Sequence, residues 1–163
     1  MILEYENYLK QATAKKSENK KFLDKLKKQK PKDLDIICNQ YHDEVFENID
    51  CLKCANCCSG TGPLFLDKDI DRLAKHLRIR PSEFTENYLR IDEDNDYVFK
   101  SVPCPFLGTD KYCSVYESRP NACREFPHTQ QRNMAQKMSI TYLNTMICPA
   151  VYLVVEKLKN YYK

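Results

Sequence analysis

Cysteine residues are concentrated in one short stretch of the chain. The sequence DCLKCANCCSGTG, at residues 50–62, contains Cys51, Cys54, Cys57 and Cys58. A C-x2-C step lets two thiolates converge on one metal, and this stretch has two such steps in series. The alternative, a core of buried and reduced cysteines, accounts for single residues better than for two overlapping steps and an adjacent pair. The spacing therefore predicts metal binding.

The chain has four further cysteines downstream that complete a candidate set of eight. Eight is twice the number of thiolates that close a tetrahedral zinc site or anchor a 4Fe–4S cluster. The adjacent Cys57 and Cys58 point in different directions on any regular backbone, so they are expected to serve different centres, or only one of them is a ligand. We therefore hypothesise two four-thiolate centres. The predicted metal ligands are Cys51, Cys54, Cys57, Cys58, Cys104, Cys113, Cys123 and Cys148.

The metal is predicted to be an iron–sulfur cluster or zinc, with iron slightly favoured. A C-x2-C-x2-C run followed by a distant Cys-Pro is typical of ferredoxin-type cluster motifs. This chain has two such dipeptides, Cys104-Pro105 and Cys148-Pro149. Proline biases the preceding cysteine toward extended geometry, which suits a ligand that reaches in from a loop. No residue stands out as catalytic, so the sequence favours a structural or redox centre over an enzyme.

Glycines and basic residues accompany the cysteines. Gly60 and Gly62 follow the cluster and are expected to let the backbone curl, so that its amides donate to metal-bound sulfur. Lys53, Arg119 and Arg124 lie beside cysteines in the sequence. They could offset the negative charge of thiolate centres, or they could form ordinary surface ion pairs.

Two histidines and the ninth cysteine are weaker candidates for metal ligands. Cys38 and His42 are one helical turn apart, but Cys38 borders an apolar stripe and is predicted to be a small buried hydrophobe. His128 becomes a candidate ligand only if one of the eight cysteines is not one.

The remaining sequence predicts a mostly α fold with a minor β element (α+β), a compact single domain organised around the metal centre or centres. Residues 1–49 are expected to form an N-terminal helical extension, and residues 50–163 the metal-binding domain. Asp33 and Asp67 are predicted to cap helices, and Pro31 to end one. Short strands are expected near residues 63–66 and on both sides of an Asp-Asn turn after residue 89, and a final helix begins just after Cys148.

Composition narrows the cellular context. The chain has 163 residues and a net charge of +3. It contains no apolar run long enough to span a membrane and no signal-peptide pattern, so we expect a cytoplasmic protein without membrane attachment.

Ten lysines lie between Lys10 and Lys32. This helix presents a solvated face that could dock a protein partner, and its lack of interleaved arginines or aromatic residues disfavours nucleic acid.

These motifs together resemble the YkgJ-type cysteine-cluster family, described as a zinc- or iron-chelating domain. The resemblance rests on CxxCxxCC at 51–58, CPFL at 104–107, CSVYESRPNACREFP at 113–127 and CP at 148–149. It covers residues 50 to about 155 and implies metal chelation by the cysteines.

A larger protein with a similar cysteine motif is the flagellin lysine N-methylase FliB, which combines an iron–sulfur centre with S-adenosylmethionine. The resemblance therefore implies, as an alternative, an iron–sulfur-dependent enzyme or enzyme component of the methyl-transfer type. A metal carrier is a third possibility. The sequence shows neither a glycine-rich nucleotide loop nor the C-x3-C-x2-C spacing of radical enzymes, so it supports the enzyme alternative less.

Overall fold

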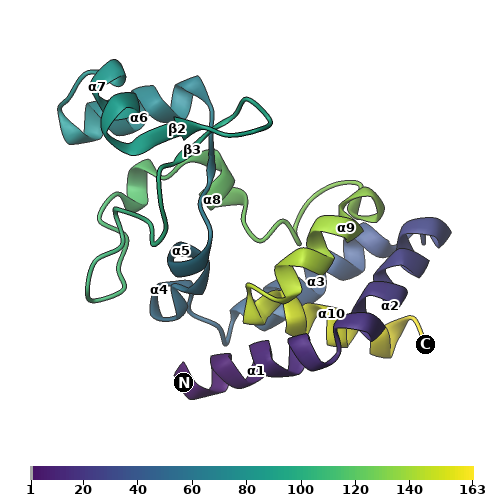
Figure 1. Ribbon diagram of the computed structural model, residues 1–163. Helices are drawn as coiled ribbons and strands as arrows, with labels where there is room; N and C mark the ends of the chain where they lie inside the picture. Colours follow the sequence, from purple (N-terminus) through teal and green to yellow (C-terminus); the bar gives the residue numbers. More distant parts are fainter. Residues whose placement is uncertain (1) are drawn as a thin grey trace. The chain divides into compact units, whose positions relative to one another are not determined.

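The computed structural model describes residues 2–163 and confirms a mostly helical fold with one small sheet (Figure 1). None of the helices within these residues is long and apolar enough to cross a membrane. The elements in chain order are α1 (Ile2–Ala14), α2 (Lys16–Gln29), α3 (Leu34–Phe46), α4 (Cys51–Cys54), α5 (Asn56–Gly60), β1 (Leu64–Phe65), α6 (Asp67–Leu77), α7 (Pro81–Tyr88), β2 (Leu89–Ile91), β3 (Tyr97–Phe99), the 3-10 helix η1 (Tyr116–Ser118), α8 (Asn121–Glu125), α9 (Met134–Thr145) and α10 (Pro149–Tyr161).

The chain folds into two compact units. The helical unit comprises Met1–Cys54 and Pro127–Lys163, and the sheet unit comprises Ala55–Phe126. The sheet unit is thus inserted, in sequence, between two segments of the helical unit. The predicted division between residues 1–49 and 50–163 stays a prediction, and each unit is described below by itself.

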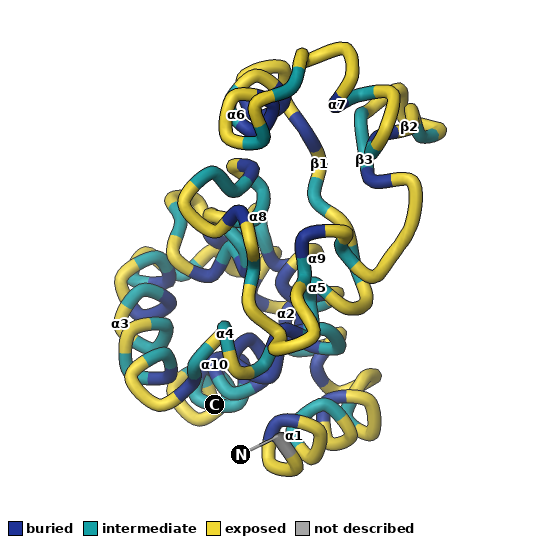
Figure 2. The backbone as a smooth tube through the Cα atoms, turned by 90° about the vertical axis from the view of Figure 1, so that its left-hand side faces the viewer, coloured by how far each residue is buried: buried dark blue, intermediate teal, exposed yellow. Residues whose placement is uncertain are grey.

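The helical unit is built around α10, which packs against α1, α3 and α9, while α2 packs against α9 (Figure 1). Residues on several sides of α10 are buried, including Val151, Tyr152, Val155 and Leu158. A helix that is apolar on most of its circumference belongs in the interior of a bundle. The helix α3 is instead amphipathic, with buried residues on one side and exposed residues on the other (Figure 2).

Of the two predicted aspartate caps, Asp33 is the N-cap residue of α3 but makes no capping hydrogen bond through its side chain, and Asp67 is wrong. The carboxylate of Asp33 instead accepts hydrogen bonds from the hydroxyls of Tyr161 and Tyr162, at 3.0 and 2.9 Å. Its backbone (φ −92°, ψ 0°) lacks the extended geometry typical of a capping residue. The N-cap of α6 is Leu66 rather than Asp67, and the carboxylate of Asp69 accepts the Leu66 amide at 3.0 Å.

The sheet unit has an aromatic core beneath a three-stranded antiparallel sheet of order β1-β3-β2. The β2–β3 hairpin confirms the pair of strands predicted around the Asp-Asn turn. Phe65 packs edge-on against Phe99 at 4.7 Å between ring centroids, and Phe84 stacks on Phe106 at 6.2 Å. The helix α6 buries one face and exposes the other (Figure 2). The thiols of Cys104 and Cys113 border this core.

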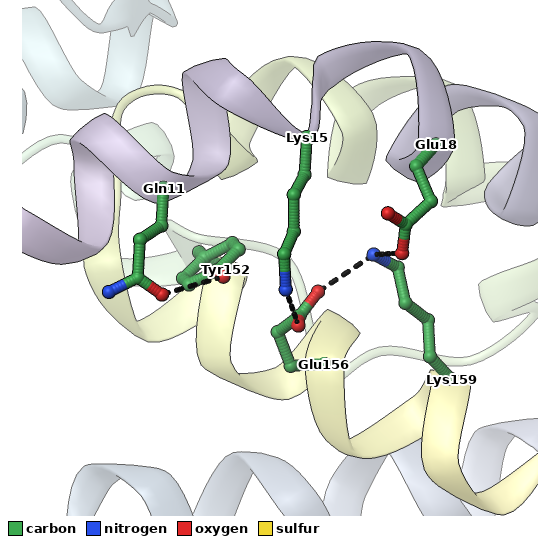
Figure 3. Close-up of polar contacts among 6 residues, drawn as sticks. All are labelled: Gln11, Lys15, Glu18, Tyr152, Glu156 and Lys159. Carbon is green, nitrogen blue, oxygen red and sulfur yellow. Dashed lines mark hydrogen bonds and ion pairs between the residues drawn. The ribbon is translucent and has the colours of Figure 1, made fainter.

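A network of charges fastens the N-terminal helices of the helical unit to α10 (Figure 3). The ammonium of Lys15 lies 2.6 Å from the carboxylate of Glu156. Lys159 bridges Glu156, at 2.7 Å, and Glu18, at 2.5 Å. Burial alone would raise the pKa of Glu156, but the hydrogen bonds from Lys15 and Lys159 outweigh it and hold this pKa below its ordinary value.

Replacing Glu156 by Gln is expected to destabilise the helical unit by about 1 kcal/mol at pH 7, because two partly buried ammonium groups lose their carboxylate. A carboxyl group with a lowered pKa stabilises the folded state above its unfolded pKa, here 4.5, and loses that effect as the pH falls through its folded pKa. The deficit of Glu156→Gln should therefore shrink below pH 4.5. Urea unfolding at pH 7 and at lower pH measures it, with the exposed Glu6→Gln as the control. An equal deficit at both pH values would contradict the assignment.

Candidate metal centre

The CxxCxxCC motif folds into two short helices. Cys51 and Cys54 occupy the two ends of the single turn α4, so their side chains lie on one face, and Cys57 and Cys58 lie on α5. The turn between the helices is made by Ala55, whose φ of 50° is left-handed. The expected role of the glycines is not observed, since no glycine within residues 2–163 has a positive φ.

Backbone contacts bring the other cysteines of the sheet unit to this motif. The amide of Cys104 donates to the carbonyl of Cys58 at 2.8 Å. Cys113 pairs with Leu107 in an isolated antiparallel bridge, which places it across a short loop from Cys104. Cys123 lies on α8, as the predicted helical turn after Pro120 requires, and α8 packs against β1.

The four thiols of Cys58, Cys104, Cys113 and Cys123 interact with one another. Burial, together with the smaller effects of the nearby Cys58, Cys104 and Cys113, raises the pKa of Cys123 to about 12. Burial, together with the smaller effects of Cys58 and Cys113, raises the pKa of Cys104 to about 11. The pKa of Cys113 is raised by burial and by Cys58. Every pair among the four is therefore close enough to interact electrostatically.

Cys58 differs from the other three in the direction in which its pKa is shifted. A hydrogen bond from the thiol of Cys57 and the guanidinium of Arg119 together lower the pKa of Cys58 to about 7 in spite of burial. Both contacts favour the thiolate, which is the form that ligates metals. The side chains of Cys57 and Cys58 interact although the residues are adjacent. Cys57 stays a predicted ligand.

Both Cys-Pro dipeptides direct backbone amides at the cysteine sulfur. The amides of Phe106 and Leu107 hydrogen-bond to Cys104, where they partly oppose the effect of burial on its pKa. The amides at the same two positions after Cys148 act in the same way. Proline has no N–H, so the two amides that follow it are the next donors available to the sulfur. Amide donors of this kind stabilise metal-bound thiolates, and the Cys-Pro turns provide what was expected of the glycines.

The helical unit gathers a second group of thiols around Cys148. This residue is buried directly before α10 and has the extended backbone predicted for a residue before proline (φ −119°, ψ 115°). Burial, together with the smaller effects of Cys51 and Cys54, raises its pKa to about 12. The cysteine that closes the motif and the first two cysteines of the motif therefore lie near one another.

The weaker candidates have other partners. Cys38 is buried, as predicted, and burial raises its pKa to about 12. Nδ1 of His42 lies 2.8 Å from the hydroxyl of Thr129. Nδ1 of His128 lies 3.0 Å from the side-chain nitrogen of Gln131.

The three basic residues near the cysteines have different surroundings. Lys53 forms an ion pair with Asp50 at 3.4 Å. Arg124 is exposed and donates to the carbonyl of Glu117 at 2.8 Å. Arg119 is the one whose charge acts on the thiols of the sheet unit, lowering the pKa of Cys58. The sequence alone did not distinguish it from the other two.

The structure adds a buried ion pair that spacing did not predict as part of the site. The carboxylate of Asp69 is fully buried and accepts from Arg72 at 2.6 Å and from the amide of Asn121 at 3.1 Å. Arg72 in turn donates to the carbonyls of Ser118, at 3.3 Å, and Arg119, at 2.6 Å. We call Asp69 and Arg72 the clamp, because they fix the backbone between Cys113 and Cys123.

The donor chemistry of these groups suits a thiolate metal centre. No group of three or more His, Cys, Asp or Glu side chains in residues 2–163 is assembled so that it could hold a metal ion. Three features nevertheless suit a thiolate centre: four thiols interact, backbone amides are directed at the Cys104 sulfur, and a guanidinium lies nearby. Binding requires the thiols to close on the metal and to release their protons.

Eight cysteines on short helices and loops, gathered within two units, define a cysteine-cluster protein. The family model CxxCxxCC, described as "Putative zinc- or iron-chelating domain", matches residues 50–148, and the chain belongs to this family. The matched range contains all eight predicted ligands. No curated protein and no solved structure matches the chain. Family membership supports metal binding, with zinc and iron both compatible.

Replacing Asp69 by Ala is expected to destabilise the protein by about 3 kcal/mol or more, because the Arg72 guanidinium and two backbone amides lose a buried acceptor. The matched control is Asp71→Ala on the exposed face of the same helix, which should change stability by less than about 0.5 kcal/mol. Urea unfolding followed by circular dichroism measures both. Similar small losses in the two variants would show that the clamp contributes little.

Proposed function

We propose that the protein binds metal through cysteine thiolates in two centres, one for each compact unit. The sheet-unit centre uses Cys58, Cys104, Cys113 and Cys123. The helical-unit centre uses Cys51, Cys54 and Cys148. Cys57 belongs to the sheet unit and stays a predicted ligand without assignment to a centre. The metal is proposed to be a 4Fe–4S cluster in preference to zinc, and its role structural or redox rather than catalytic.

The observation that carries this proposal is the mutual interaction of the four thiols in the sheet unit. They come from four separate segments of the chain, and every pair interacts. A core that buried its cysteines only as small hydrophobes would not require four of them to interact with one another, or three of them to interact with the Arg119 guanidinium. Four thiolates are the number that closes a zinc site or anchors a cubane cluster.

A structural contribution follows from where the ligands lie. Cys104 and Cys113 flank a loop that has one isolated bridge, and Cys123 lies on a helix of five residues. Such short elements gain little stability from their own backbone hydrogen bonds. A metal that joins them converts its binding free energy into folding free energy.

The preference for iron rests on the cluster motif and on the Cys-Pro turns. The C-x2-C-x2-C run and a later Cys-Pro are features of ferredoxin-type sites. Hydrogen bonds to ligand sulfur are one of the means by which proteins set the potential of a cluster. The amide donors at Cys104 and Cys148 therefore suit a redox centre, although four-thiolate zinc accepts the same donors.

Purification without oxygen, followed by a visible spectrum and elemental analysis, tests the proposal. We expect brown protein that absorbs near 400 nm and contains iron and sulfide in matching amounts. Colourless protein with stoichiometric zinc would keep the thiolate centres and overturn the choice of iron. Protein without any metal would overturn the proposed function. Binding of S-adenosylmethionine to the metal-loaded protein, measured by calorimetry, would instead favour the methyl-transfer alternative.

Serine substitutions test the division of ligands. Cys58→Ser and Cys148→Ser should each remove the metal of one centre and so lower the metal content by about half, because each removes a ligand of a different proposed centre. Cys38→Ser, which changes a buried cysteine outside both sets, is the control and should leave the metal content unchanged. Complete loss of metal in both ligand variants would contradict two independent centres.

A further inference from the structure

Arg119 has a nitrogen that the protein leaves without a hydrogen bond. Within the described residues, its Nε is buried and has no hydrogen-bond partner. Its guanidinium carbon lies 3.5 Å from the centre of the Tyr116 ring, so the planar group stacks on an aromatic face. Leaving a buried N–H of a charged group unsatisfied costs free energy, and such groups in native proteins call for an explanation.

The guanidinium acts electrostatically on three thiols of the sheet unit. Burial raises the pKa of Cys113 and Cys123, and the charge of Arg119 opposes this effect. At Cys58 the same charge helps to lower the pKa. The cation therefore lies near three of the four proposed ligands.

The clamp fixes the backbone from which Arg119 extends. The carbonyl of Arg119 accepts a 2.6 Å hydrogen bond from Arg72, and the carbonyl of Ser118 accepts a second bond from the same guanidinium. The amide of Asn121, two residues on, donates to the buried Asp69. The polar contacts on both sides of Arg119 thus end on one buried ion pair, which limits where its side chain can reach.

We propose that Arg119 is a positioning residue for the sheet-unit centre: its positive charge balances the thiolates, and its Nε–H donates to a ligand sulfur. The inference rests on the proposed function. Four thiolates bring four negative charges, and Zn²⁺ or a [4Fe–4S]²⁺ cluster offsets two of them. A net charge of −2 in a partly buried site is costly unless a cation compensates it. A sulfur ligand also accepts the N–H that is otherwise unsatisfied.

The test compares the rates at which metal-loaded proteins lose metal to excess EDTA. Arg119→Gln removes the charge and the Nε–H donor, and we expect metal of the sheet-unit centre to be lost about tenfold faster, the effect of removing one hydrogen bond from a charged group. If the centre is an iron–sulfur cluster, its reduction potential should also become more negative, by about 59 mV for a tenfold effect on a one-electron couple. The matched control is Arg124→Gln, which removes an exposed arginine beside Cys123.

The outcomes separate this inference from the proposed function. Wild-type protein without metal would overturn both. Metal-loaded wild type whose release rate and potential match those of Arg119→Gln would overturn the role of Arg119 alone. Arg119→Lys keeps the charge and has no Nε–H, so we expect it to release metal at an intermediate rate, and full recovery would overturn the hydrogen-bond assignment. If Arg119→Gln binds no metal at all, the metal content of Arg119→Lys decides the matter. Metal retained by Arg119→Lys would support the inference, and a loss equal to that of Arg119→Gln would overturn it.

Discussion

The cysteine-bearing part of the sheet unit depends on one buried carboxylate. Asp69 is fully buried, and a charge in such a position is tolerated only when it is paired and hydrogen-bonded. Its partners are Arg72, the start of α6 and the start of α8, so a single side chain joins a regular helix to the irregular segment between Cys113 and Cys123. The aromatic core stabilises the unit through hydrophobic packing, which does not fix the positions of individual backbone atoms. The ion pair between Asp69 and Arg72 does so, because each of its hydrogen bonds holds a particular backbone atom.

The same arrangement of backbone amides after a Cys-Pro dipeptide occurs at one cysteine of each unit. Cys104 and Cys148 both precede proline, and both sulfurs interact with the two amides that follow that proline. The amides lower the cost of ionising a buried thiol, whereas burial raises it, and burial has the larger effect on both pKa values. A metal cation reverses this balance because it stabilises the thiolate directly. The two Cys-Pro turns are thus preorganised for the ionised state rather than for the thiol.

The spacing of neighbouring residues in the sequence predicted the helices and strands of this fold better than it predicted which side chains contact one another. The helix predicted to begin just after Cys148 is α10, because the burial of a helix face shows in the spacing of neighbouring apolar residues. Asp33 is at the predicted N-cap position of α3, but its carboxylate binds two tyrosines more than a hundred residues later in the chain, which a local pattern does not reveal. The importance of Asp69 could not be predicted for the same reason, since Asn121 lies 52 residues away. Spacing named the candidate ligands, but which thiols approach one another depends on tertiary packing.

The order of the cysteines in the chain indicates where a metal would stabilise most. Cys51 and Cys54 approach Cys148 within the helical unit, and the whole sheet unit lies between them in sequence. A cross-link that closes a loop of about 100 residues removes about 4.7 kcal/mol of chain entropy from the unfolded state in the loop-closure model, against about 3 kcal/mol for a 15-residue loop. In the sheet unit the loops between proposed ligands are shorter, since Cys58 precedes Cys104 by 46 residues and Cys104 precedes Cys113 by 9. Metal at either group of cysteines should therefore contribute to stability, with the larger loop-closure effect at the helical-unit cysteines. The sheet-unit thiols have in addition the charge of Arg119, which acts on their ionisation.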